Sequence, residues 1–232
     1  MAEPAMKLII RFGGSVVASP LNPKLIGEYA ELLKKLKDEG YSVVAVTGGG
    51  EIARQFIKAA KSLGLGEAVQ DELAIKASRL VAELLQKKLG GEACPKIPVS
   101  VEEAENCLKE GKIVVMGGLK PGMTTDTVAA LVAKAIKADM LVKATDQEGI
   151  YTKDPKKYKD ARLLRKVKIE DLEKIFEENR HKAGIHQILD PEAIKILKEL
   201  KLKVVVVNGF KPENVELAVK GEAVGTLVEA WQ

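Results

Sequence analysis

Short apolar runs alternate along the chain with longer stretches in which apolar residues recur at helical spacing. Runs of mainly β-branched or aliphatic residues that stop at glycine or polar positions are typical of buried parallel strands. Strands are therefore predicted at Lys7–Phe12, Ser42–Val46, Ile97–Val99, Ile113–Met116, Leu141–Ala144, Lys203–Val207 and Ala223–Val228.

Helical spacing fills most of the intervals between these runs. Gly40 is expected to stop the first long helix, and Asp190 to cap a later helix that has Pro191 in its first position. The basic stretch 156–168 carries no regular pattern and is predicted to be a loop. Helices are predicted at Pro23–Glu39, Glu51–Leu63, Glu67–Leu89, Val101–Lys109, Thr127–Ala138, Ile169–Asn179, Pro191–Leu200 and Glu213–Lys220.

The alternation of strand and helix predicts the fold class. Strands joined through helices run parallel, and the helices then cover both faces of the sheet. The expected architecture is an α/β fold, a three-layer α/β/α sandwich with a mostly parallel central sheet. The chain has 232 residues, 46% of them hydrophobic, which is enough for one large domain or two closely fused halves.

Two glycine turns directly follow the first two predicted strands. The turn 13–15 reads GGS, and the turn 48–50 reads GGG and opens a helix. Glycines in such a turn let backbone N–H groups approach an anion, and the helix dipole adds a favourable field. Arg54, one helical turn further on, adds a positive charge. Phosphate binding is therefore favoured here over the alternative, a simple tight turn.

The segment 114–154 contains two further loops, each at the end of a predicted strand. The first runs from Gly117 to Asp126 and the second begins at Thr145. Loops at the carboxyl ends of parallel strands are where open α/β sheets bind ligands. Two loops in one unit predict two ligands.

Charge and composition exclude several classes of protein. The formal charge of +4 is small beside 37 basic and 33 acidic residues, and the two signs are interspersed, which argues against a nucleic-acid-binding protein. No apolar run approaches the roughly 18 residues that a membrane span needs. The high content of Lys and Glu is typical of hyperthermophiles.

The cysteines and histidines offer little chemistry. Cys94 and Cys107 match neither a zinc spacing nor a redox pair, so we expect two buried or idle thiols in a reducing cytosol. His181 and His186 lie in one late loop without a zinc signature, and are expected to be surface residues. No metal site made by the protein alone is predicted.

The predicted carboxyl edge is instead rich in backbone amides and hydroxyl groups. Several phosphate-type turns on one edge suit phosphoryl transfer between two anionic ligands, in which a protein mainly positions groups and neutralises charge. The sequence contains no GxxxxGK[ST] motif and no GxGxxG after the first strand. A kinase of this sequence must hold its nucleotide in another way.

These motifs together resemble the amino acid kinase family. The order is GGS after the first strand, GGG followed by Arg after the second, a TTD loop opening a helix, and KATDQEGIYTKDP after a later strand. The loop MGGxxPGxTTD is most similar to that of archaeal-type uridylate kinases. The resemblance extends from Met6 over essentially the whole chain, and it implies a single kinase domain over residues 1–232.

The resemblance assigns an ATP site and a UMP site. It implies that the N-terminal half holds UMP and the C-terminal half holds ATP, with Mg²⁺ bridging the β and γ phosphates. The residues implied at ATP are Gly13, Gly14, Ser15, Gly50, Arg54, Thr145, Asp146, Tyr151 and Asp154. Those implied at UMP are Gly49, Asp71, Leu119, Lys120, Pro121, Gly122, Met123, Thr124 and Thr125.

Asp126, Arg11 and Arg54 are the implied catalytic residues. Asp126 would orient the essential lysine of the family or Mg²⁺-bound phosphates. Many relatives have lysine where this chain has Arg11, and a guanidinium lacks the compact geometry of an ammonium. Arg11, Arg54, Lys143 and Mg²⁺ therefore all remain candidates for the main positive charge.

Simpler readings remain for several of these residues. Asp126 could be only an N-cap, Tyr151 a packing residue, and the residue before Pro155 only the start of a turn. Asp71 near the start of a long helix could merely complement the dipole.

The expected reaction is transfer of a phosphoryl group from ATP to UMP in the cytoplasm. The alternatives are another kinase of the same fold, acting on a carboxylate, a carbamate or an isoprenoid phosphate, and a non-catalytic nucleotide or oxyanion store. The family further implies a homo-oligomer, a homohexamer, with the helix Glu67–Leu89 as a candidate interface.

Overall fold

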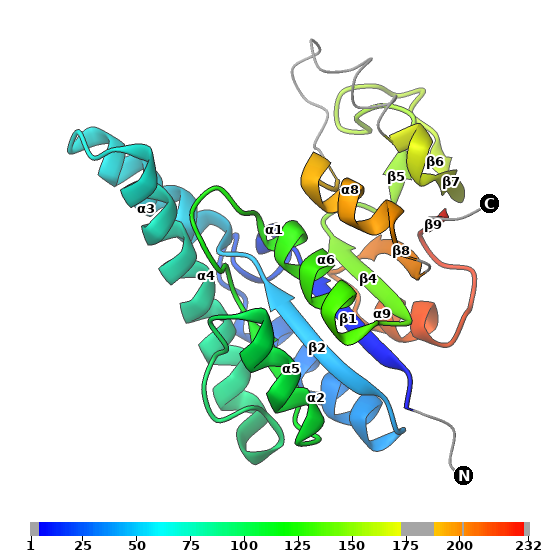
Figure 1. The fold of residues 1–232 in the computed structure, drawn as a ribbon. Coiled ribbons are helices and arrows are strands. Elements are labelled where there is room, and N and C mark those ends of the chain that lie inside the picture. The colour runs from blue at the N-terminus through cyan, green and yellow to red at the C-terminus, as the bar shows by residue number, and fades with distance from the viewer. Residues whose placement is uncertain (1–4, 173–187, 201, 230–232) are drawn as a thin grey trace.

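The computed structural model describes residues 5–172, 188–200 and 202–229. Its centre is a seven-stranded sheet in the order β3-β2-β1-β4-β8-β9-β7, in which only β8 and β9 pair antiparallel (Figure 1). The predicted, mostly parallel sheet is thereby confirmed. The strands are β1 Lys7–Phe12, β2 Ser42–Thr47, β3 Val114–Met116, β4 Met140–Thr145, β7 Lys166–Lys168, β8 Lys203–Asn208 and β9 Thr226–Glu229.

Helices cover both faces of this sheet. The core on one face is built with α2 (Pro23–Asp38), α4 (Glu67–Leu89) and α9 (Pro212–Val219). The core on the other face is built with α5 (Val101–Lys109), α6 (Thr125–Ile136) and α8 (Pro191–Lys198). The described part of the chain is therefore a three-layer α/β/α sandwich, as predicted. Helix α3 (Gly50–Ser62) lies along α4, and the two helices project beyond the sheet (Figure 1).

Side-chain alternation in β1 and β4 prepares the site. In β1, Leu8 and Ile10 face α2 while Ile9 faces α6, and Arg11 follows on the α6 side. In β4, Leu141 likewise faces α6, and Lys143 follows it. Arg11 and Lys143 are paired in register, and side chains alternate between the two faces of a strand. Both cations therefore lie side by side under the start of α6.

Two predicted elements are wrong. The run Ile97–Val99 is not a strand: Pro98 lacks the N–H that a ladder needs, and Ala93 instead makes the bridge to Ile113. The presumed loop 156–168 contains β6 (Leu163–Leu164), which pairs with β5 (Ile150–Tyr151), and also β7. Strands of two or three residues are too short to show a period.

Two other predictions fall partly or wholly outside the described residues. The helix predicted at Ile169–Asn179 is helical over residues 169–172, and the rest of it lies outside. His181 and His186 also lie outside the described residues, so their prediction is not tested.

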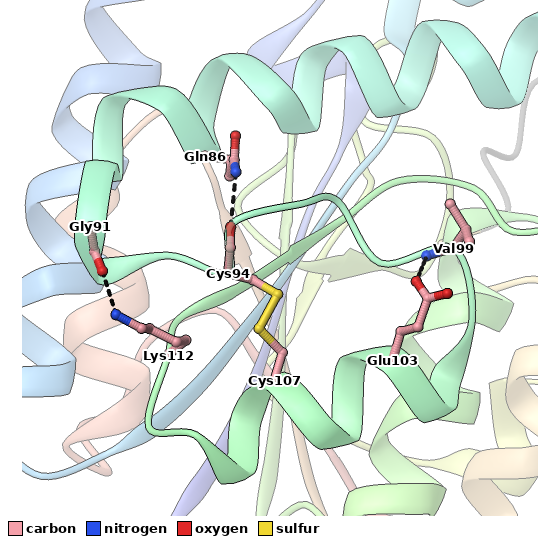
Figure 2. The surroundings of a disulfide bond; sticks show 7 residues. All are labelled: Gln86, Gly91, Cys94, Val99, Glu103, Cys107 and Lys112. Atoms are coloured by element: carbon pink, nitrogen blue, oxygen red, sulfur yellow. Dashed lines mark hydrogen bonds between the residues drawn. A yellow bond between two sulfur atoms is a disulfide. The ribbon is translucent and has the colours of Figure 1, made fainter.

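The expectation of two idle thiols is wrong, because Cys94 and Cys107 form a disulfide (Figure 2). Cys94 N–H donates to the Ile113 carbonyl (2.9 Å) and Gln86 of α4 donates to the Cys94 carbonyl (2.8 Å), so Cys94 is held both beside the start of β3 and against α4. Spacing rules detect metal and redox motifs and carry no information about this contact. Closing a loop of this size contributes about 3 kcal/mol to stability in the chain-entropy view.

Among the described residues, no helix is both long and apolar enough to cross a bilayer.

Candidate active site

The two glycine turns interlock at the carboxyl ends of β1 and β2. A Cβ on Gly14 would lie 2.3 Å from the Gly50 nitrogen, and a Cβ on Gly50 would lie 2.3 Å from the carbonyl oxygens of Gly14 and Ala18. Gly50 also has a φ of +55°, which L-residues rarely adopt. Glycine is therefore required on both sides of this contact. Ser15 follows within α1 (Gly14–Val17), a single helical turn that was not predicted.

A hollow of about 360 Å³ opens beside the interlocked turns. Basic side chains, hydroxyl groups and glycine backbone dominate its wall, which is a composition suited to phosphate groups. The lining residues are Arg11, Gly14, Ser15, Gly48, Gly49, Gly50, Arg54, Thr125, Asp126, Lys143, Thr145, Asp146, Gln147 and Ile188. We call this space the donor hollow.

Asp126 joins two cations at the floor of the donor hollow, the buried Lys143 and the partly buried Arg11. Lys143 Nζ donates to Asp126 Oδ2 (2.7 Å) and to the carbonyl of Ile188. Arg11 Nε lies 2.9 Å from Asp126 Oδ1, an ion pair without hydrogen-bond alignment, while Arg11 Nη2 donates to Thr125 Oγ1 (2.9 Å). One carboxylate therefore faces two positive charges, and the cluster keeps a net positive charge toward the hollow.

Burial lowers the pKa of Lys143 to about 8. The neighbouring Arg11 charge acts in the same direction, and Asp126 opposes both. An anionic ligand in the donor hollow would raise the pKa of Lys143, because nearby negative charge favours the protonated amine.

A second hollow, of about 290 Å³, lies between α4 and the loop that precedes α6. Asp71 of α4 accepts a hydrogen bond from Gly122 N–H (2.8 Å), which ties the loop to the helix across this space. The lining residues are Gly49, Ala53, Asp71, Ala74, Ile75, Ser78, Gly118, Lys120, Gly122, Met123, Thr124 and Thr125. We call this space the acceptor hollow.

The two hollows meet at Gly49 and Thr125, which line both. A Cβ on Gly49 would lie 2.7 Å from the Ala53 Cβ and 3.1 Å from Ser78 N, so only glycine fits there. Two ligands that fill the hollows would therefore approach each other over a wall made of glycine backbone and a hydroxyl group.

The loop before α6 is held from several sides. Ser78 Oγ accepts from Gly118 N–H (2.8 Å), and Arg79 donates to the carbonyls of Gly118 and Leu119 (2.8 and 3.0 Å). At its other end, Thr124 donates to Asp190 (2.5 Å). Burial would raise the pKa of Asp190, but the hydrogen bonds from Thr124 and from the first turn of α8 outweigh it and lower that pKa.

Most residues implied by the family resemblance line one of the two hollows, but five do not. Gly13 lies behind the donor hollow, where its N–H donates to the Ala144 carbonyl (2.8 Å). Leu119 packs into the core beside α6, and Pro121 is exposed. Tyr151 lies half-buried in β5, and Asp154 lies in the turn after it.

The simpler readings have different outcomes. Asp126 is not the N-cap of α6, because Thr124 caps that helix by accepting from Thr127 N–H (3.1 Å). Asp71 lies beyond the first turn of α4 and contacts the loop. Asp154 does start a turn, since its side chain accepts from Lys156 N–H (2.9 Å). Asp190 caps α8 as predicted.

Sequence reasoning missed a row of residues on α4. Ala74, Ile75 and Ser78 follow Asp71 at spacings of three, four and seven, so they share its face of the helix and line the acceptor hollow with it. The signal was present: Ser78 is a polar residue placed two turns after Asp71. Gln147 and Ile188 of the donor hollow had no comparable signal.

The side chains of the donor hollow suit a metal ion that is bound together with the phosphates of a ligand. No cluster of three or more His, Cys, Asp or Glu side chains within 5–172, 188–200 and 202–229 could hold a metal. Asp146 lines the donor hollow and is bonded by Lys156 (2.9 Å), whose charge outweighs the burial of Asp146 and lowers the pKa of that carboxyl. Mg²⁺ is commonly held by one or two carboxylates plus substrate phosphates, and Asp146 fits that role.

If the donor hollow binds ATP, as the family resemblance implies, Lys143 makes that binding depend on pH. Since its pKa is about 8 without ligand, ATP binding above pH 8 must bring a proton to the amine, and affinity should fall by up to about tenfold per pH unit there. Calorimetry between pH 7 and pH 9.5 in two buffers of different ionisation enthalpy would measure both the affinity and the proton uptake. Lys143→Met should remove the proton uptake, and an unchanged uptake in that variant would contradict the assignment.

The chain belongs to the amino acid kinase family, whose model matches residues 6–208. It is 44% identical over 226 residues to a uridylate kinase of Methanocaldococcus jannaschii, covering 97% of this chain and all of that protein. It is 43% identical over 225 residues to a uridylate kinase of Hyperthermus butylicus, covering 97% of this chain and 99% of that protein.

Solved structures agree with this assignment. The uridylate kinase of Archaeoglobus fulgidus is 39% identical and superposes with a TM-score of 0.87 over 96% of this chain and all of that one. The UMP kinase of Bacillus anthracis, at 22% identity and a TM-score of 0.81, shares the fold and covers 99% of this chain and 98% of its own.

Proposed function

We propose that this chain transfers the γ-phosphoryl group of ATP to UMP, giving ADP and UDP, and so serves pyrimidine nucleotide synthesis. The observation that carries the proposal is the meeting of the two hollows at Gly49 and Thr125. Relatives that match this chain over nearly their whole length are uridylate kinases, which supports UMP as the acceptor.

The proposed roles follow from what each wall offers. Arg54 and the backbone of Gly14, Ser15 and Gly50 bind the ATP phosphates. Arg11 and Lys143, held side by side by Asp126, stabilise the charge that develops on the transferred group. The UMP phosphate is already ionised near neutral pH, so the transfer requires no general base.

The remaining site residues are proposed to bind the nucleosides. Asp71, Lys120, Met123 and Thr124, with Gly122 and the neighbouring Leu119 and Pro121, hold UMP. Thr145 and Asp146, with Tyr151 and Asp154 further out, hold the ATP nucleoside. Asp146 would hold Mg²⁺ together with the phosphates of ATP, and the ion would neutralise phosphate charge during the transfer.

The proposed division of labour follows the two halves of one kinase domain, residues 1–232. The acceptor hollow is lined from residues 49 to 125, which supports an N-terminal UMP site. The donor hollow also draws on Thr145, Asp146 and Ile188, which supports ATP lying over the C-terminal half while its phosphates reach the glycine turns.

Replacement of Asp71 tests the acceptor. Asp71→Ala removes the carboxylate that lines the acceptor hollow and holds Gly122, so we expect the KM for UMP to rise about 10- to 100-fold, while ATP affinity changes less than twofold. Steady-state kinetics with UMP, CMP, AMP and GMP, together with ATP calorimetry, would measure both. Glu72→Ala, at the exposed neighbouring position, is the matched control.

Two results would refute the proposed function. ADP release that is the same with and without UMP, combined with no thermal protection by UMP, would exclude UMP as the acceptor. Tight ATP binding without turnover of any monophosphate would favour a nucleotide store.

We further propose a cytoplasmic location. A disulfide is unusual in a reducing compartment, but intracellular proteins of hyperthermophiles are an exception, and the Lys- and Glu-rich composition is of that type. Thiol titration of the native protein purified under argon would detect no free thiol if the disulfide persists in the cell.

Self-association is proposed as well, with a homohexamer as the expected state. Helix α4 carries a second apolar stripe that faces away from the core, with Val69 (40% exposed), Leu80 (57%) and Leu84 (45%), and Phe56 of α3 is 49% exposed. A helix that is apolar on two faces is expected to pack against a second protein surface, and another copy of this chain would supply that surface. Light scattering should show an oligomer that Leu80→Glu dissociates.

A further inference from the structure

Ser19 lies where the two glycine turns and the start of α3 come together. Its hydroxyl donates to the Gly14 carbonyl (3.0 Å) and accepts from Glu51 N–H (2.8 Å) and from Arg54 Nη2 (3.0 Å). A hydroxyl has one donor and two acceptor sites, so the three contacts use its full capacity. Gly14 belongs to the glycine turn after β1, Glu51 lies in the first turn of α3, and Arg54 lines the donor hollow.

Arg54 depends on this contact. Over the described part of the chain, the Ser19 hydroxyl is the one group that bonds the Arg54 guanidinium, and no carboxylate lies within ion-pair distance of it. An exposed arginine held only by a neutral oxygen keeps its full charge for an anionic ligand. The hydroxyl also restricts a long side chain that would otherwise sample many rotamers.

From this arrangement we infer that Ser19 is a positioning residue for the phosphate site, acting through Arg54. The hydroxyl fixes the guanidinium over the donor hollow, so the side chain is ordered before ATP arrives. The inference rests on the proposed ATP site but not on UMP as the acceptor. Backbone contacts alone already tie the turns together, because Glu51 N–H also donates to the Ala18 carbonyl (2.8 Å).

A double-mutant cycle on ATP affinity tests this inference. Ser19→Ala should weaken ATP binding about five- to tenfold, as expected for a lost hydrogen bond to a charged group. In an Arg54→Met background the same change should cost less than twofold, because its effect passes through the guanidinium. Binding is measured by calorimetry with ATP alone, so a protein that fails to phosphorylate UMP still reports on Ser19.

The controls separate positioning from folding. Ser19→Thr keeps the hydroxyl and should restore wild-type affinity within twofold. Ser62→Ala removes a hydroxyl at the far end of α3, bonded to the Lys58 carbonyl, and should change nothing. If Ser19→Ala does not fold, Ser19→Cys keeps the volume with a weak hydrogen-bonding group and carries the same expectation.

Two outcomes would overturn the inference. Equal losses from Ser19→Ala with and without Arg54 would mean that Ser19 only supports the turns. Unchanged ATP affinity in Ser19→Ala would mean that the hydroxyl contributes nothing to phosphate binding.

Discussion

Asp126→Asn should both destabilise the protein and nearly abolish phosphoryl transfer. The substitution keeps the shape of the side chain but leaves Arg11 and Lys143, whose side chains are 13% and 5% exposed, without a compensating charge. Removing one partner of a buried ion pair costs about 3 to 5 kcal/mol. For a chain of this length that corresponds to a fall in Tm of roughly 10 °C.

The catalytic loss has the same origin. With Asp126 neutral, Arg11 and Lys143 repel each other and the pKa of Lys143 falls further, so the charge and position proposed to stabilise the transferred phosphoryl group are lost and kcat should fall on the order of 10²- to 10³-fold. ATP supplies the missing negative charge, so it should raise the Tm of the variant more than that of the wild type. Calorimetric melting with and without ATP, and initial rates of ADP formation, measure these effects.

Asp38→Asn is the matched control, because Asp38 is exposed near the end of α2. It should leave both the Tm and the rate unchanged. A stable Asp126→Asn variant with a near-normal rate would show that Arg11 and Lys143 do not require the carboxylate.

The sheet could be read from the sequence because its strands are buried on both faces. The run Lys7–Phe12 (KLIIRF) is mainly apolar and is followed by glycine, and the structure starts and ends β1 at those residues. Short strands that form only beside a neighbouring strand could not be predicted from the sequence. Leu163–Leu164 and Lys166–Lys168 become strands only because β5 and β9 lie beside them.

The cation cluster was within reach of the sequence in part. Arg11 and Lys143 each lie two positions after an apolar residue in a buried strand. Side chains two positions apart point to the same face of a strand, so both cations lie on one face of the sheet. Their pairing with Asp126 required knowing that β1 and β4 are neighbours, a contact between residues more than a hundred positions apart. The Cys94–Cys107 disulfide and the hydrogen bond from Gly118 N–H to Ser78 are likewise contacts that no local pattern encodes, although the helix face on which Ser78 lies could be predicted.

Gly50→Ala should disable the donor hollow more completely than any surface change. The added Cβ would lie 2.3 Å from the carbonyl oxygens of both Gly14 and Ala18, and backbone atoms cannot move aside as a flexible side chain can. The positive φ of Gly50 adds about 1 to 2 kcal/mol of strain. If the turns separate by even about 1 Å, catalysis should fall at least about 100-fold, as expected for misplaced reacting groups.

Two other glycines separate the causes of that loss. Gly64 also has a positive φ, +73°, but no atom lies within 4 Å of its Cβ position, so Gly64→Ala should show the strain without the loss of activity. Gly27 lies inside α2 with the same open space, and Gly27→Ala should stabilise the protein by about 0.5 to 1 kcal/mol. Since only Gly50 combines strain with a collision between the two turns, a Gly50→Ala variant that binds and hydrolyses or transfers ATP normally would mean that the interlocked turns do not hold the phosphates.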